Sequence, residues 1–134
     1  MTPISALKSA LHALLSGDAT LAGLLGGAKI HDDVPRGQLT PYVVFGEATA
    51  RENGTSSDRG HVCDLTLLAW SRQGGSREAL AIADRIGALV DDAALTLSGH
   101  RLVLLRVIAT EVRRTPEKDL TRATLRLRAI TEVI

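Results

Sequence analysis

The chain has 134 residues, a formal net charge of +1, 45% hydrophobic residues and only 2% aromatic residues. This length predicts a single domain over residues 1–134, with a core built mainly from Leu, Val, Ile and Ala. The near absence of aromatic side chains disfavours carbohydrate binding and enzymes that grip flat substrates. A charge this close to zero gives no field that indicates nucleic-acid binding by itself.

The single cysteine, Cys63, excludes an internal disulfide, and no Cys/His spacing resembles a zinc site. The start of the chain has no basic region followed by an apolar run, so no signal peptide is predicted. The longest apolar segment, from Leu102 to Ala109, is interrupted by Arg106 and is too short to span a bilayer. We therefore expect a soluble intracellular protein with no metal, cofactor or membrane partner.

Two short helices are predicted at the start of the chain. From Pro3 to Leu15, apolar residues recur at spacings of three and four, which is typical of one helix face. Gly17 is expected to end this helix, and Asp18 to cap a second one from Ala19 to Leu25. A brief extended piece, residues 30–33, follows.

The segment from residue 34 to residue 72 contains all three large aromatic residues, and it predicts a long hairpin at the middle of a sheet. Its strands are Tyr42 to Glu52 and His61 to Ser71, both rich in β-prone residues. The polar stretch from residue 52 to residue 59 has no apolar anchor and is expected to form an exposed, mobile tip. Five residues are singled out as structural anchors of this segment: Pro35, Pro41, Tyr42, Gly46 and Trp70.

After Gly74-Gly75, Ser76 is expected to cap the clearest helix. Its apolar stripe consists of Ala79, Ile82, Ala83, Ile86, Leu89, Val90 and Ala93.

Two long strands are expected to close the chain. In the strand from Leu102 to Arg114, the residues expected on one face are Val103, Leu105, Val107 and Ala109. In the last strand, the residues expected to face inward are Ala123, Leu125, Leu127 and Ala129. The predicted order is α-α-β-β-α-β-β. This order predicts an α+β fold: a mainly antiparallel four-stranded sheet, a long helix packed on it, and two short N-terminal helices.

No constellation in the sequence indicates catalysis. In the extended piece, only His31 and Asp33 can point the same way, and no other acidic or histidine cluster accompanies them. Cys63 lies on the same alternating face as Leu65 and Leu67, which favours a buried hydrophobe over a nucleophile. The glycine pairs lack the Gly-Lys-Ser/Thr that follows in a phosphate loop. We expect no enzyme activity.

The last hairpin carries a local excess of arginine. The residues predicted to contact a neighbouring subunit or a tube are Arg113, Arg114, Arg122, Arg126 and Arg128, together with Asn53, Thr55, Asp58 and Arg59 of the tip. On a strand, Arg122, Arg126 and Arg128 share one face. That face is either an ordinary solvated surface or one that forms intersubunit salt bridges or lies near passing DNA. Without interleaved aromatics, sequence-specific or single-strand binding is not expected.

The order and spacing of several segments resemble those of a known family. These are the helical start L-K-S-A-L-H-A-L-L-S-G-D-A-T-L-A-G-L-L-G-G, then D-D-V-P, T-P-Y-V-V-F-G-E, L-T-L-L-A-W-S-R, S-R-E-A-L-A-I-A-D-R-I and the closing R-L-R-A. The chain is similar along nearly its whole length to the phage tail-completion proteins. These are also called tail terminators or head–tail joining proteins, of long-tailed phages and phage-like gene transfer agents.

The resemblance implies a structural virion protein with an α+β fold and no catalytic residues. Such a protein is made in the host cytoplasm and forms a ring, expected to be a hexamer, at the head-proximal end of the tail. The expected partners are other copies of the chain, the tail tube protein and the head–tail connector, with DNA passing through the ring without sequence-specific contacts. Two alternatives remain: a small-molecule or peptide-binding module with the loop from Val34 to Pro41 as its rim, and an enzyme that uses His31 and Asp33.

Overall fold

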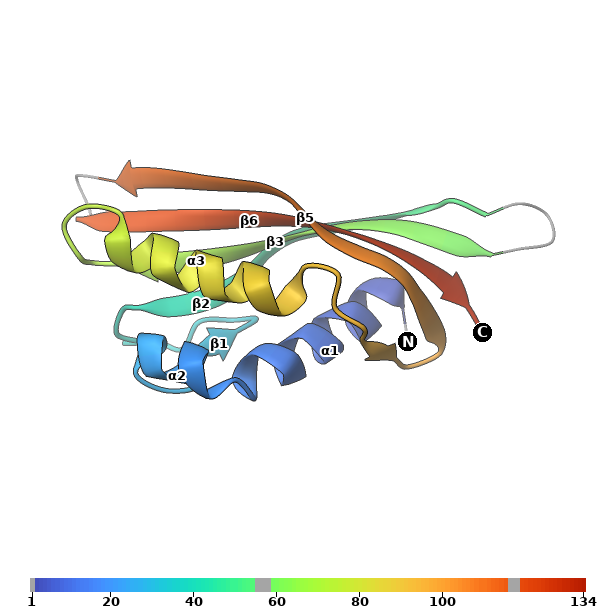
Figure 1. Cartoon of the computed structure of the whole chain (residues 1–134), viewed down its shortest axis with the longest axis horizontal. Helices are drawn as coiled ribbons and strands as arrows, with labels where there is room; N and C mark the ends of the chain where they lie inside the picture. The colour runs from blue at the N-terminus through green and yellow to red at the C-terminus, as the bar shows by residue number, and fades with distance from the viewer. Residues whose placement is uncertain (1, 55–58, 116–118) are drawn as a thin grey trace.

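The computed structural model describes residues 2–54, 59–115 and 119–134, and within them the chain forms three helices and six strands (Figure 1). The helices are α1 (Pro3–Ser16), α2 (Ala19–Leu25) and α3 (Arg77–Val90). The strands are β1 (Ile30–His31), β2 (Tyr42–Glu52), β3 (Gly60–Ser71), β4 (Thr96–Leu97), β5 (His100–Thr115) and β6 (Leu120–Val133).

The predicted four-stranded sheet is wrong, because the strands form one mixed sheet in the order β1-β2-β3-β6-β5-β4. The two strands not foreseen, β1 and β4, have two residues each, too few to show a periodic pattern. Strand β1 pairs in parallel with β2, with Ile30 opposite Val43, which makes the sheet mixed. The middle of the sheet is formed by β3 and β6, whereas the predicted hairpin β2–β3 lies nearer one edge.

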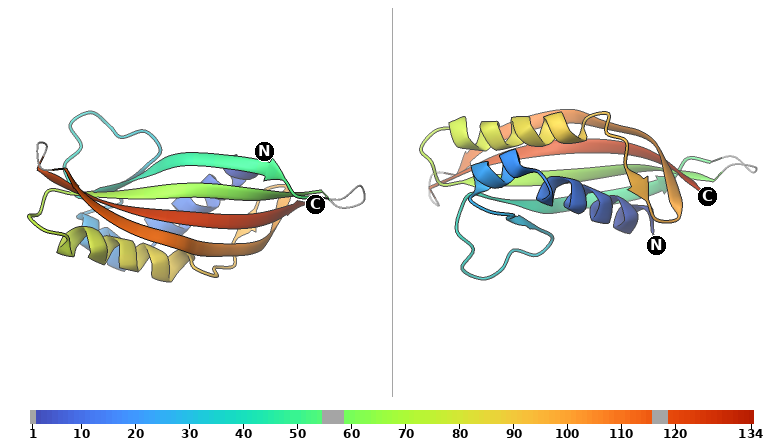
Figure 2. Two further views of the ribbon diagram at one scale, coloured as in Figure 1. Left: turned by 90° about the horizontal axis from the view of Figure 1, so that it is seen from above. Right: turned by 60° about the horizontal axis from the view of Figure 1, so that its bottom comes forward.

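The sheet curls into a half-barrel, and the helices lie on one of its faces while the other face is left without a helix (Figure 2). The expectation of one long helix and two short ones is also incorrect. Helices α1 and α3 each have 14 residues, and only α2, with 7, is short. The fold is α+β, as predicted, but it consists of three helices on a six-stranded curled sheet.

The core lies between the helices and the sheet, and β6 contributes to it as its alternation predicts. Ala123, Leu125, Leu127 and Ala129 are each at most 1% exposed. Facing them from α3 are Ala79, Ile82, Ala83, Ile86 and Val90, all buried. Because full burial of a Val, Leu or Ile side chain stabilises by roughly 1.5–3 kcal/mol, this layer contributes substantially to stability. Cys63 is also buried, as predicted, and burial raises the pKa of its thiol.

The single alternation predicted for β5 is wrong. Of the four residues expected on one face, Leu105 is buried and Val107 partly buried, whereas Val103 is 52% exposed and Ala109 is also exposed. The register with β6 shifts twice, between Leu102 and Leu104 and between Val107 and Ala109. Each shift inserts one extra residue and so changes which residues face inward, which a period of two cannot represent.

The predicted helix N-caps are confirmed in part. Asp18 caps α2, its Oδ2 accepting from the Leu21 N–H at 2.8 Å. Ser76 occupies the N-cap position of α3, as predicted, but its side chain makes no capping hydrogen bond. The Gln73 side chain takes this role, because its Oε1 accepts from the Glu78 N–H at 3.0 Å. In the described part of the chain, no helix is long and apolar enough to span a membrane.

Candidate assembly surfaces

The uncovered face of the sheet carries most of the predicted arginines in cross-strand rows. Arg122 of β6 lies opposite Trp70 of β3 and Arg113 of β5. Three rows further along the same face, Arg128 lies opposite Asp64. Because side chains alternate along a strand, Arg122, Arg126 and Arg128 project from the same face, as predicted. We call this surface the open face.

Arg128 is tied down on the open face by Asp64. Its Nε donates to Asp64 Oδ1 at 2.8 Å, and Arg51 of β2 approaches the other carboxylate oxygen at 3.3 Å. The hydrogen bond from Arg128 and then that from Arg51 lower the pKa of Asp64, although partial burial opposes them. These three residues therefore form a cross-strand ion-pair row that fixes the neighbouring positions of β2, β3 and β6.

Arg122 and Arg126, the other two arginines that β6 places on the open face, are less constrained. The Arg122 guanidinium lies 5.8 Å from the centre of the Trp70 ring, within the range of a cation–π contact. Arg126 is exposed, and no carboxylate in the described part of the chain pairs with it. It lines two shallow grooves, of about 310 and 250 Å³, that run across the open face. Arg126 is thus an exposed cation of the open face with no ion pair to a described carboxylate.

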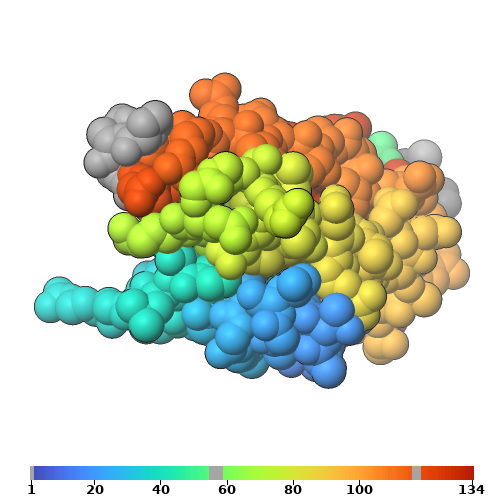
Figure 3. All heavy atoms as spheres, turned by 60° about the vertical axis from the view of Figure 1, so that its left-hand side comes forward, coloured from blue at the N-terminus to red at the C-terminus, as the bar shows by residue number. Residues whose placement is uncertain are grey.

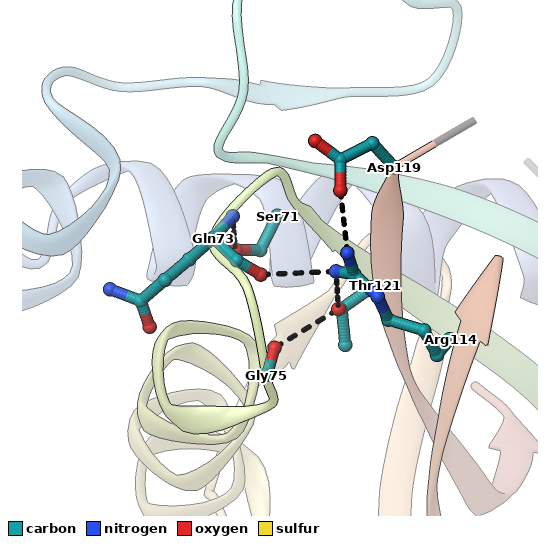
Figure 4. A network of polar contacts seen from close by, with 6 residues as sticks. All are labelled: Ser71, Gln73, Gly75, Arg114, Asp119 and Thr121. Atoms are coloured by element: carbon teal, nitrogen blue, oxygen red, sulfur yellow. Dashed lines mark hydrogen bonds and ion pairs between the residues drawn. The ribbon is translucent and has the colours of Figure 1, made fainter. Parts of the chain in front are cut away.

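The remaining two predicted arginines differ from each other. Arg113 pairs with Glu111 of its own strand at 2.7 Å. Arg114 belongs to a local network at the end of β5 (Figure 4), where it donates to the Gln73 carbonyl at 3.2 Å and to Asp119 at 2.5 Å. It also donates to Thr121 Oγ1 at 2.9 Å, while the Thr121 hydroxyl donates to the Gly75 carbonyl at 3.0 Å. Arg114 therefore fastens the end of the last hairpin to the segment before α3.

The ends of β2 and β3 that lead to the predicted tip extend beyond the helices (Figure 1). Of its four predicted contact residues, Thr55 and Asp58 lie outside the described residues. Asn53 is exposed, and its N–H donates to the Gly60 carbonyl at 2.9 Å. The Arg59 carbonyl accepts from the Val133 N–H at 3.0 Å. The described base of the tip is therefore bonded to β6 as well as closed on itself.

The structural anchors of the hairpin have clear local roles. Tyr42 lies opposite Trp70 at the start of the pairing between β2 and β3. Gly46 lies at the irregularity in that pairing, and a Cβ there would meet Thr66 Oγ1 at 2.3 Å. Only glycine fits at that point. The loop before β2 includes Pro35 and ends at Pro41, which follows a cis peptide bond.

The loop between β1 and β2 projects from the body (Figure 3), and its Leu39 side chain is 76% exposed. The sequence reading did not single out Leu39, although it is the one large apolar residue between the two prolines of this loop. In the proposed enzyme pair of His31 and Asp33, the His31 ring is hydrogen-bonded to the Gln38 side-chain amide oxygen at 2.8 Å. Across residues 2–54, 59–115 and 119–134, no group of three or more His, Cys, Asp or Glu could hold a metal ion.

Comparison with known proteins places this architecture in a class. Over 98% of its length, the chain superimposes on 98% of a chain of a native gene transfer agent virion particle, with a TM-score of 0.90 and 31% sequence identity. No curated protein matches the sequence. The fold is thus that of a structural protein of phage-type tails, located in the virion tail. More specifically, the chain belongs to the family described as "Tail completion protein gp17", whose model matches residues 9–132.

Proposed function

We propose that the chain is a tail terminator. Copies form a ring, with six subunits as the resemblance implies, that caps the completed tail tube and joins it to the head connector. The observation that carries this proposal is the match of nearly the whole chain, at 31% identity, to a chain of a gene transfer agent virion particle. In this role the protein is a structural component and not an enzyme, and it needs no cofactor.

Two features of the fold support this role. A ring subunit needs two different surfaces that fit each other, and β2 and β3 extend past the helices at one end of the sheet (Figure 1). The open face combines Arg122, Arg126 and Arg128 with Glu47 and Asp64, so its charge is mixed. Such a face suits contacts with protein neighbours.

The test combines a mass measurement with tail binding. The purified chain is examined by native mass spectrometry over a range of concentrations, and then mixed with tail tubes that lack their terminator. We expect a ring-sized homo-oligomer in solution, and electron micrographs with a ring at one end of each tube. Tubes mixed with an unrelated protein of similar size serve as the control. A chain that stays monomeric at high concentration and leaves the tubes bare contradicts the proposal.

A further inference from the structure

The two long outer strands, β2 and β5, are each covered by a two-residue edge strand, β1 or β4, over one half only and have no strand beside the other half in the described structure. On β2, the Val43 N–H donates to the Lys29 carbonyl at 2.9 Å, and β1 pairs beside it. A register shift follows between Phe45 and Ala48. Beyond the shift, no strand of the described chain pairs with the outer side of residues 48–52. We call residues 48–52 the open half of β2.

The same arrangement occurs on the opposite edge. Strand β4 covers the start of β5, and the Asp92 N–H then donates to the Leu105 carbonyl at 2.8 Å. The Asp91 carboxylate next accepts from the Val107 N–H at 2.9 Å. A register shift follows between Val107 and Ala109, and in the described structure no strand pairs with the outer side of residues 109–115. We call residues 109–115 the open half of β5.

We infer that the open half of β5 in one copy pairs with the open half of β2 in the next copy, so that the sheet continues from subunit to subunit. This inference rests on the proposed ring and names the surfaces that form it. The two halves differ in sequence and lie on opposite edges of the sheet. Pairing them is therefore a head-to-tail contact, the kind that closes into rings.

The backbone groups that point outward can be identified from the alternation of an antiparallel ladder. Val43 and Leu105 already make backbone hydrogen bonds on the outer side of their strands, so they show which alternate residues face outward. Counting along the pairing with β3, the backbone groups of Ala48, Ala50 and Glu52 point outward from β2. Counting along the pairing with β6, those of Thr110, Val112 and Arg114 point outward from β5.

The directions of β2 and β5, and the side of the sheet on which their side chains lie, also agree with this pairing. Three antiparallel steps separate β2 from β5 within one copy, so the two strands run in opposite directions. A neighbour related by a modest rotation thus presents β2 antiparallel to β5. Ala50 pairs with Cys63, and Val112 with Ala123, so the outward residues of both halves lie on the helix-bearing side. The joined sheet keeps its helices on one face.

The charges of facing side chains favour one register of the pairing between β2 and β5 of the next copy. With Ala50 opposite Val112, the next residues place Arg51 opposite Glu111 on the open face. Both side chains are accessible: Arg51 is 61% exposed, and Glu111 is 42% exposed. A slip of two residues would instead place Arg51 opposite Arg113. Opposite charges facing each other across two strands stabilise the pair, and like charges destabilise it.

Proline substitutions test the pairing, because proline removes one backbone N–H and is tolerated where that N–H faces solvent. Ala50→Pro removes an outward donor from β2, and Thr110→Pro removes one from β5. We expect each variant to be monomeric in native mass spectrometry while keeping the wild-type circular dichroism spectrum. Ala50→Ser and Thr110→Ser retain the N–H and should keep the wild-type mass.

Mixing the two proline variants gives the sharpest result. The Ala50→Pro chain retains the open half of β5, and the Thr110→Pro chain retains the open half of β2. The mixture therefore contains one complementary pair of strands. We expect a 1:1 dimer from the mixture that grows no further, and only monomer from the double variant. If one proline variant alone keeps a dimer while the other is monomeric, the contact joins two identical edges and the inference is overturned.

Cysteine cross-linking is independent of whether the proline variants fold. In the stated register, Ala50→Cys and Val112→Cys of adjacent copies face each other at about 5.5 Å between Cα atoms, a separation that a disulfide can span. The oxidised double variant should give a ladder of linked chains on a denaturing gel, and each single variant should stay unlinked. Cys63 is buried and does not interfere.

The outcomes separate this inference from the proposed function. A wild-type ring that persists in both proline variants and does not cross-link overturns the edge pairing and leaves the tail-terminator role intact. A wild-type chain that is monomeric and does not bind tail tubes overturns both.

Discussion

Asp18 and Arg85, 67 positions apart in the sequence, form a two-point ion pair that joins the start of α2 to α3. The Arg85 Nε donates to Asp18 Oδ2 at 2.9 Å, and its terminal nitrogen donates to Oδ1 at 2.7 Å. The same carboxylate caps α2 through the Leu21 N–H. One side chain therefore both begins a helix and fastens it to another.

Replacing Asp18 should separate these two contributions. Asp18→Asn keeps an oxygen for the cap but loses the charge, whereas Asp18→Ala loses both. Both variants should have a lower melting temperature at neutral pH, and the alanine variant should have the lower of the two. Ser9→Ala, on the exposed side of α1, is a control that should melt like wild type. Equal melting of all four proteins would contradict this assignment.

The ion pair between Asp18 and Arg85 also predicts that folding stability depends on pH in the acid range. The hydrogen bond from Arg85, followed by that from Leu21, lowers the pKa of Asp18 below its ordinary value of 3.8. A carboxyl with a lowered folded-state pKa stabilises the fold fully above its unfolded pKa and loses that contribution as pH falls through the folded value. The difference in stability between wild type and Asp18→Asn should therefore be constant above pH 5 or so and shrink below 3.8. Urea unfolding at several pH values measures it.

Gly46 should tolerate no side chain while Thr66 is present. A Cβ at residue 46 would lie 2.3 Å from Thr66 Oγ1 but 3.4 Å from its Cβ. Gly46→Ala should destabilise the protein by roughly 1–3 kcal/mol, as is typical of overpacking. The double variant Gly46→Ala, Thr66→Ala removes the clashing hydroxyl and should recover much of that loss. A double-mutant cycle from denaturant unfolding measures the coupling, and strictly additive effects would be inconsistent with the contact.

Leu125 and Val103 provide a matched pair of positions on adjacent strands. Leu125 is 1% exposed and Val103 is 52% exposed. Leu125→Ala should destabilise the protein by about 2–5 kcal/mol. Val103→Ala should change stability by less than about 0.5 kcal/mol. Thermal unfolding followed by circular dichroism distinguishes them, and similar losses at both positions would contradict the assigned facing of β5.

Arg126→Glu should affect partners and not the fold. The residue is exposed and has no ion pair with any described carboxylate. The melting temperature should stay near that of wild type, while binding to subunits or tail tubes weakens. Arg128→Glu is the contrasting variant, since it places a carboxylate against Asp64 and should lower the melting temperature as well. Unchanged binding in Arg126→Glu would exclude a contact role for this arginine.

Local patterns predicted some parts of this structure well. The span of α2 and the Asp18 cap follow from residues a few positions apart, and the inward face of β6 follows from strict alternation. The small strands β1 and β4 and the bulges of β5 depend on which distant segments lie alongside them. Residues 102–109 are apolar apart from Arg106, so little in their own pattern marks where a bulge begins.

The assembly surfaces were foreseen only in part. Arg122, Arg126 and Arg128 do share a face, since a strand places alternate residues together. Whether each arginine is free or already paired depends on partners such as Asp64, which lies 64 positions from Arg128 in the sequence. The family itself was correctly suggested by several weak motifs whose order and spacing are informative together.

The position of β6 has a consequence for how the molecule is made. It lies between β3 and β5 at the centre of the sheet, yet it is the last of the six strands to leave the ribosome. Until then β3 and β5 have no common neighbour, and the apolar face of α3 has only part of its sheet to pack on. Sheets closed by such distant pairings fold slowly because long loops must be ordered first. Sheet closure is therefore a late step, and under the pairing proposed above a newly synthesised subunit presents both open halves on one sheet only after β6 has been inserted.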